Sequence, residues 1–232
     1  MISSSLVLVA TLGAGIAAAA GPVGFPFTDE TLNYSLNMPG GPKLGEGHLR
    51  ANKTESGAWR FELALDAPVP LFEIHDVYTA RASGDFCGAE FTKKFQHGAK
   101  KGNESTDIDR SRGTATRKTA NGGGKSEFSV PDCTKDALTL LMYTRKEMGQ
   151  GRMPSSQRVL FGAAYDAQMT YTGTEKISVP GFPPDADKVV CVLKGPKSSV
   201  RIELLFARDA ARTPVTMRLP LAVGSFSLEL VR

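Results

Sequence analysis

Hydrophobic and polar residues alternate with a period of two over most of the chain from Phe27 onward. In the clearest case, residues 58–65, the apolar positions are Trp59, Phe61, Leu63 and Leu65. A period of two places alternate side chains on one face of a strand, so each such run predicts a half-buried β-strand. About a dozen of these runs, joined by short turns rich in Gly, Pro, Asn and Asp, predict a mostly antiparallel sheet.

One segment departs from this pattern. Over residues 132–151 the spacing is helical, with Leu138, Leu141, Met142, Arg145 and Met148 recurring three or four residues apart. This spacing predicts the single α-helix of the chain, and its apolar stripe predicts that the helix packs on the sheet. Asp132 or Thr134 is expected to cap its start, and Gly149 or Gly151 to end it.

The expected fold class is therefore mainly β. So many consecutive strands must curl or split to bury one face of their sheet. The pattern predicts a large curved antiparallel sheet or an open barrel, with one α-helix packed on its concave side. No repeat, no alternation of strands with helices and no interdomain linker stands out, so residues 21–232 are expected to form a single β-rich domain.

The first twenty residues differ from the rest because none of them is charged. An apolar run of about ten residues that ends in four consecutive alanines is typical of a secretory signal peptide. Residues 1–20 are therefore predicted to be a signal peptide, and the protein to be periplasmic or exported. No later segment is long and apolar enough for a membrane helix, so we do not expect a transmembrane protein.

Composition and charge are those of a globular protein, with 41% hydrophobic and 22% charged residues and a formal net charge of +4. The densest basic stretch, residues 91–105, interleaves Phe91 and Phe95 with Lys93 and Lys94. Nucleic-acid sites cluster lysine and arginine with stacking aromatics on one face, which this stretch does not clearly do. It is expected to be a solvated hairpin end, and no nucleic-acid partner is predicted.

Three cysteines are present, so they cannot all pair within one chain. Cys191 stands among valines in an apolar strand, where a free cysteine behaves as a small hydrophobic residue. In an oxidising compartment the remaining two are expected to form a disulfide, Cys87–Cys133, with Cys191 buried and reduced. No cysteine or histidine spacing typical of a metal site occurs, so no metal is predicted.

The sequence carries no signature of an enzyme. It lacks the Gly-x-Ser-x-Gly motif of many serine hydrolases and a glycine-rich phosphate loop, so no cofactor is predicted. His75 and Asp76 are adjacent, but neighbouring residues on a strand point to opposite faces and do not form a catalytic pair there. We therefore expect a protein that is not an enzyme.

Three stretches resemble a bacterial exported family known as domain of unknown function 3108. They are DETLNYSLNMPGGPKLGEGHL, DALTLLMYTRKEMGQG and ARDAARTPVTMRLPLAVGSFSLELV, and the resemblance extends over about residues 28 to 232. It implies a periplasmic or outer-membrane-facing β-rich fold and no particular reaction. A looser similarity, at the level of the fold, is to the concave β-sheet carriers that move lipids or lipoproteins across the periplasm.

Two functions remain open. In the first, a non-catalytic envelope protein binds an apolar or lipid-like ligand between the sheet and the helix. Its candidate ligand-binding residues are Trp59 and Phe61 on a strand and Leu141, Met142, Tyr143 and Arg145 on the helix, where Tyr143 and Arg145 would hold an anionic head group. The same tyrosine and arginine also suit a core lid and a salt bridge. In the second, the interior is filled and the protein is a structural or interaction module with an envelope partner.

Overall fold

The computed structural model describes residues 29–38, 41–69, 72–120, 122–196, 198–221 and 224–231. The predicted signal peptide, residues 1–20, lies outside these ranges. The strands are β1 Asp29–Asn37, β2 Lys43–Lys53, β3 Trp59–Val69, β4 Phe72–Ala82, β5 Gly88–His97, β6 Lys100–Asp109, β7 Thr114–Thr119, β8 Lys125–Ser129, β9 Lys135–Asp136, β10 Gln157–Leu160, β11 Ala164–Lys176, β12 Asp185–Lys194, β13 Ser199–Ala207, β14 Pro214–Leu221 and β15 Gly224–Val231. The helix is α1 Ala137–Gly149.

All described strands belong to one 15-stranded sheet, with the order β8-β7-β6-β5-β4-β3-β2-β1-β15-β14-β13-β12-β11-β10-β9. Neighbouring strands are antiparallel except β9 and β10, which are parallel. The first and last strands of the chain pair with each other, with Tyr34 opposite Leu230. The pairing of β1 with β15 joins the two halves of the chain, so the free edges of the sheet are β8 and β9.

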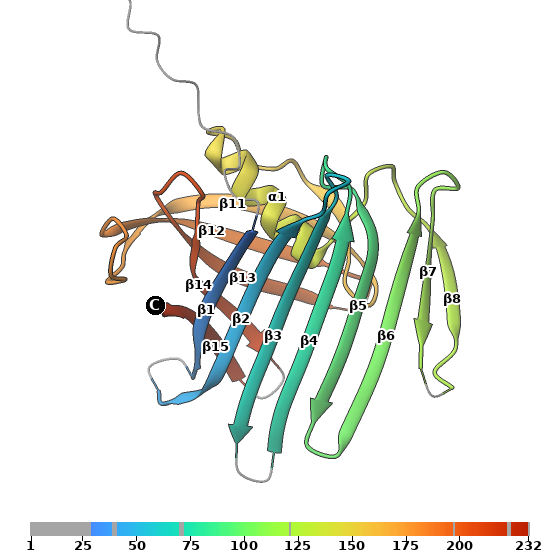
Figure 1. The fold of residues 1–232 in the computed structure, drawn as a ribbon, viewed down its shortest axis with the longest axis horizontal. Helices are drawn as coiled ribbons and strands as arrows, with labels where there is room; N and C mark the ends of the chain where they lie inside the picture. The colour runs from blue at the N-terminus through green and yellow to red at the C-terminus, as the bar shows by residue number, and fades with distance from the viewer. Residues whose placement is uncertain are drawn as a thin grey trace, which may run out of the picture.

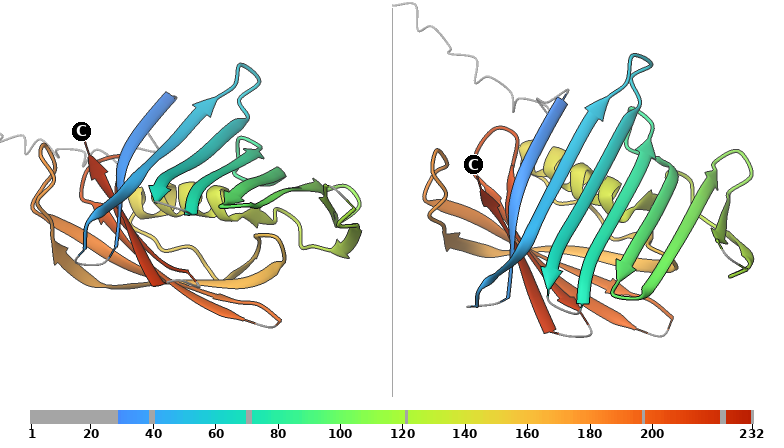
Figure 2. Two further views of the ribbon diagram at one scale, coloured as in Figure 1. Left: turned by 90° about the horizontal axis from the view of Figure 1, so that it is seen from below. Right: turned by 60° about the horizontal axis from the view of Figure 1, so that its bottom comes forward.

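The sheet is strongly curved. Strands β1 to β5 lie over strands β11 to β14, and α1 lies between the two layers, across one end of the concave face (Figures 1 and 2). This arrangement confirms the predicted class: mainly β, a large open curved sheet, and one helix on the concave side. Sheets with so many strands bury a face by curling, because a flat sheet would leave both faces in water.

The strands follow the alternation in the sequence, with some differences. In β3, Trp59 and Phe61 are buried, as their period of two predicts. The structure has more strands than the dozen expected, because the polar stretch after Gly98 still forms β6 and β7. The chain continues through a bulge at Gly173 (φ 122°), so β11 ends only at Lys176.

The helix begins later than predicted. Its N-cap is Asp136, whose carboxylate accepts a hydrogen bond from the backbone N–H of Thr139. Neither Asp132 nor Thr134 caps it, because Cys133 adopts a left-handed conformation (φ 55°) and the next residues extend into β9. At the other end, Gly151 is left-handed (φ 72°), as expected for a residue just past a helix, while Gly149 is the last helical residue.

The predicted disulfide is confirmed. Cys87, just before β5, is bonded to Cys133, just before β9, and the two cysteines are 46 positions apart in sequence. The backbone N–H of Gly88 donates a hydrogen bond of 2.9 Å to the carbonyl oxygen of Thr134 beside it. The disulfide therefore ties the segment that leads into α1 to the start of β5, in the N-terminal half of the sheet. Cys191 is free and buried, as predicted.

A buried ion pair holds the second half of α1. The guanidinium of Arg145 donates two hydrogen bonds to the carboxylate of Glu30 on β1, at 2.7 and 3.0 Å. Its Nε also donates to the carbonyl oxygens of Ala211 and Arg212, in the turn before β14. The Arg145 side chain is 0% exposed and that of Glu30 15% exposed. Of the two roles open for Arg145, the geometry is that of the salt bridge.

Removing this arginine should destabilise the fold strongly. Arg145→Ala leaves the Glu30 carboxylate and two carbonyl oxygens without their donor, and breaking such a buried pair typically costs about 3–5 kcal/mol. Urea unfolding followed by circular dichroism measures the loss. The control is Arg158→Ala, which breaks an exposed pair with Asp166 and should cost less than about 1 kcal/mol. Equal losses in the two variants would contradict this prediction.

The disulfide should contribute comparably. Replacing both Cys87 and Cys133 by Ala removes a closure of 46 residues, for which chain entropy gives about 4 kcal/mol. The unfolding midpoint of the wild type should fall to that of the double variant on addition of a thiol reductant, and the variant should not respond. A wild-type midpoint that is insensitive to reductant would argue against this contribution.

Candidate functional site

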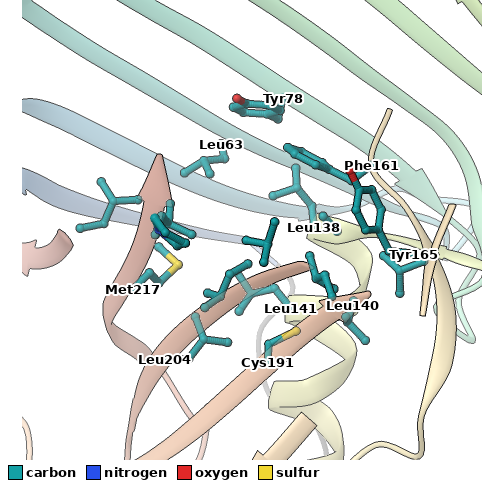
Figure 3. Close-up of a pocket in the computed structure, with 18 of the residues that line it drawn as sticks. Leu63, Tyr78, Leu138, Leu140, Leu141, Phe161, Tyr165, Cys191, Leu204 and Met217 are labelled. Atoms are coloured by element: carbon teal, nitrogen blue, oxygen red, sulfur yellow. The ribbon is translucent and has the colours of Figure 1, made fainter. Parts of the chain in front are cut away.

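A cavity of about 410 Å³ lies between the two layers of the sheet and α1. Figure 3 shows Tyr78, Phe161 and Tyr165 on one side of it and Leu204, Cys191 and Met217 on the other. Nearly all of its wall is hydrocarbon. The lining residues are Leu63, Leu65, Asp76, Tyr78, Phe91, Ala137, Leu138, Leu140, Leu141, Val159, Phe161, Tyr165, Met169, Cys191, Leu193, Val200, Ile202, Leu204, Met217, Leu219, Pro220 and Leu228.

One wall is formed by the C-terminal strands. Leu204, Met217 and Leu228 lie side by side because the register places Leu204 opposite Met217 and Met217 opposite Leu228. Val200 and Ile202 continue the same face of β13 at a period of two. These five side chains form a continuous apolar surface across three neighbouring strands.

The opposite wall is formed by the N-terminal half of the sheet and the helix. Leu63 and Leu65 of β3 point inward, next to Tyr78 of β4. The first turns of α1 close one end of the cavity with Ala137, Leu138, Leu140 and Leu141. The cavity is therefore bounded by strands from both halves of the chain and by the helix that separates them in sequence.

The cavity is open to solvent at the end away from the helix. Leu65, Val200 and Leu219 are only partly buried, and Pro220 is exposed. They stand near the ends of β3 and β14 and the start of β13. An apolar wall that reaches the surface offers a ligand a way in without unfolding of the sheet.

Polar groups gather at one side of the wall. Tyr78 donates a hydrogen bond of 2.9 Å from its hydroxyl to Asp76 Oδ2, and His97 Nε2 lies 2.9 Å from Asp76 Oδ1. Both carboxylate oxygens of Asp76 are thus engaged. Burial, and then the neighbouring Asp76 carboxylate, raise the pKa of Tyr78, so its hydroxyl stays protonated and keeps donating.

The two faces of β4 separate His75 from Asp76, as the period of two predicts. Asp76 is buried on the inner face, whereas His75 is on the outer face, with its Nδ1 2.5 Å from Asp66 Oδ1. The hydrogen bond that the His75 imidazole donates to the Asp66 carboxylate raises the pKa of His75. The inner partner of Asp76 is instead His97, on the next strand. Sequence spacing gives no signal for this pair, since only the β4–β5 register brings it together.

Of the six candidate ligand-binding residues, the structure places only Leu141 in the cavity wall. Met142 is fully buried beneath it, and its sulfur contacts Arg145. Phe61 stacks with Trp59 and with Phe86. Phe86 also makes tilted ring contacts with Trp59 and with Tyr143 of α1. These residues form the aromatic packing under the helix rather than the wall of the cavity.

The position of the helix explains why some inward residues of β3 line the cavity and others pack under α1. Because α1 crosses one end of the concave face, it covers the inward residues at the start of β3 and leaves those further along uncovered. Trp59 and Phe61 belong to the first group, and Leu63 and Leu65 to the second. The alternation that marked all four as inward carries no information on where the helix lies.

Two buried titratable groups adjoin the cavity. Burial raises the pKa of Cys191 to about 11, so this thiol stays protonated at neutral pH. Burial likewise raises the pKa of Asp136 to about 6, against the hydrogen bonds it accepts from Thr139. Asp136 precedes the two helical residues that close the cavity, Ala137 and Leu138. Its protonation state therefore acts directly on the start of α1.

One group of potential metal ligands occurs among the described residues: Asp85, Cys87 and Cys133. The two cysteines are joined in the disulfide, so neither offers the thiolate that binds metals. As long as the disulfide is intact, this cluster is not suited to hold an ion.

Among the residues that the structure describes, no helix has the length and hydropathy needed to cross a membrane.

A family model described as "Protein of unknown function (DUF3108)" matches residues 32–231. No curated protein matches the chain.

A solved structure shares the fold. It is the beta-barrel-like protein of domain of unknown function DUF1849 from Brucella abortus, with a TM-score of 0.63 and 10% sequence identity. The similarity covers 89% of this chain and 97% of the other. At this identity the likeness concerns the architecture alone.

The buried cap should make stability depend on pH. The folded state binds the Asp136 proton more tightly than the unfolded state, so protonation favours folding and this contribution is lost as pH rises from about 4 to about 6. Asp136→Asn keeps a capping side chain but cannot titrate. The unfolding free energy of the wild type should fall relative to this variant by up to about 3 kcal/mol over that window. Urea unfolding at several pH values measures it, and parallel curves would contradict it.

Proposed function

Since the chain belongs to the DUF3108 family, whose description names no activity, we propose a function from the cavity: the protein binds an apolar or lipid-like ligand there and is not an enzyme. The observation that carries the proposal is the cavity itself. Its volume of about 410 Å³ falls within the range of about 300–1,000 Å³ that is typical of small-molecule sites. A wall of leucine, methionine and aromatic side chains favours hydrocarbon over polar ligands.

The same observation supports the ligand-binding function over the structural module, which was the other function that the sequence left open. A structural module would fill its interior with side chains, because close packing is the normal state of a protein core. Here the inward residues of β3, β13 and β14 leave space between them, although each strand follows the expected alternation. A cavity that is lined by apolar groups and open to solvent favours the ligand-binding function.

We place this function in the cell envelope. The disulfide Cys87–Cys133 supports an oxidising compartment, where such bonds persist. The uncharged apolar run in residues 1–20 is typical of a secretory signal. A periplasmic ligand-binding protein accounts for both features. Native mass spectrometry of the protein purified from its own envelope fraction should detect a bound hydrophobic molecule, and its absence under all gentle extraction conditions would count against the proposal.

Filling the cavity should abolish binding. Val200 lies in the wall near the open end, and Val200→Trp places an indole in the space that a ligand would occupy. We expect the fluorescence enhancement of N-phenyl-1-naphthylamine, an uncharged apolar probe, to be largely lost. The unfolding midpoint should be unchanged or higher, because the added ring fills empty volume.

The matched control is Val231→Trp, since Val231 is 44% exposed on β15 and does not line the cavity. It should bind the probe like the wild type. Equal probe fluorescence in both tryptophan variants would show that the probe binds elsewhere, and no enhancement with the wild type would remove the support for an apolar site.

A further inference from the structure

A lysine faces inward beside the cavity. Lys93 is on β5 directly opposite Tyr78 of β4, and its ammonium lies 5.8 Å from the centre of the Tyr78 ring. It also lies 5.6 Å from the ring of Phe161 and 5.0 Å from that of Phe95. Tyr78 and Phe161 line the cavity, so the charge stands at the edge of the apolar wall.

Aromatic side chains on β5 and the neighbouring strand β4 are packed around Lys93. Phe91, Lys93 and Phe95 all point to the inner face of β5, where aromatic rings flank the lysine on both sides along the strand. Across from Phe95, a Cβ on Gly102 would lie 2.2 Å from the phenyl ring, so only glycine lets the ring pack flat on β6. The aromatic surroundings favour a cation and lower its access to water.

The nearby carboxylates are already engaged by other groups. Glu104 is opposite Lys93 on β6, but its Oε2 accepts hydrogen bonds from Arg117, with Nη2 at 2.8 Å. Asp76 is bonded to Tyr78 and His97. Among the described residues, Lys93 forms no ion pair. The aromatic rings around its ammonium attract it, but they do not neutralise its charge.

We propose that Lys93 binds the acidic head group of a single-chain amphiphile whose hydrocarbon chain occupies the cavity. This inference rests on the proposed function and names the class of its ligand. An ammonium with three donors is a good partner for a carboxylate or phosphate, and it attracts them more strongly beside a low-dielectric wall. A volume of about 410 Å³ is near the lower end for ligand sites, which favours one hydrocarbon chain over a two-chain lipid.

The test compares three probes that share one chain: palmitate, hexadecyl phosphate and hexadecanol. The concentration at which each probe displaces N-phenyl-1-naphthylamine from the full-length protein gives the relative affinities of the three probes. We expect one or both acidic probes to bind at least about tenfold more tightly than the alcohol, as a charge-assisted hydrogen bond implies. The preferred acid distinguishes a carboxylate from a phosphate head group.

Lys93→Gln should remove this preference and leave hexadecanol binding unchanged, and Lys93→Arg should restore most of it. The matched control is Lys94→Gln, on the same strand but exposed on the opposite face, which should keep the preference. Thermal unfolding checks that all three variants are folded.

The outcomes separate this inference from the proposed function. If hexadecanol binds and the acids show no advantage, or if Lys93→Gln and Lys94→Gln behave alike, the role of Lys93 is overturned while the apolar site stands. If no probe displaces the fluorophore and the fluorophore itself does not bind, the proposed function fails and the role of Lys93 fails with it.

Discussion

The width of one helix is the constraint on which the interior depends. A single continuous sheet has curled until its two halves face each other, and α1 is the only helix among the described residues that separates them. An α-helix is about 10 Å wide, whereas strands of eleven residues such as β3 and β4 are roughly 37 Å long. A helix that lies across the strands therefore covers only one end of the concave face, and the uncovered apolar residues surround the cavity.

Such a cavity costs free energy, because apolar side chains gain less when they face empty space than when they are packed. Two attachments hold the helical segment in its position across one end of the concave face. The disulfide Cys87–Cys133 holds the chain just before α1, and the Arg145–Glu30 pair holds the helix itself. Both connect it to the N-terminal half of the sheet, so the helix cannot slide along the concave face and fill it.

The inner face changes from apolar to polar along the sheet. Strands β13 to β15 contribute aliphatic side chains, whereas β4 and β5 contribute a carboxylate, a phenol, a histidine and a lysine close together. These polar groups are arranged so that each carboxylate has its own donors and the lysine lies against aromatic rings. A ligand with one apolar and one charged end matches this change in character better than a pure hydrocarbon does.

Several features could be predicted from the sequence. Alternation identified the strands and the inward side of β3, helical spacing identified α1, and the valines around Cys191 led to the correct disulfide. These predictions succeed because periodicity and local polarity are properties of neighbouring residues. The stretch around Lys93 was more difficult. Its inner face combines two phenylalanines with a charge, and it looks irregular until Tyr78 and Phe161 are seen to lie against the lysine.

The candidate site was predicted only in part. Leu141 belongs to the wall, whereas Trp59, Phe61 and Tyr143 pack under the helix and Arg145 binds Glu30. The amino-acid sequence by itself determined which side chains turn inward and that one helix would pack against them. The tertiary structure decided which of those side chains the helix covers and which acidic and basic side chains pair. Both depend on the strand register and on where the helix crosses the sheet, because these follow from contacts between residues far apart in the chain.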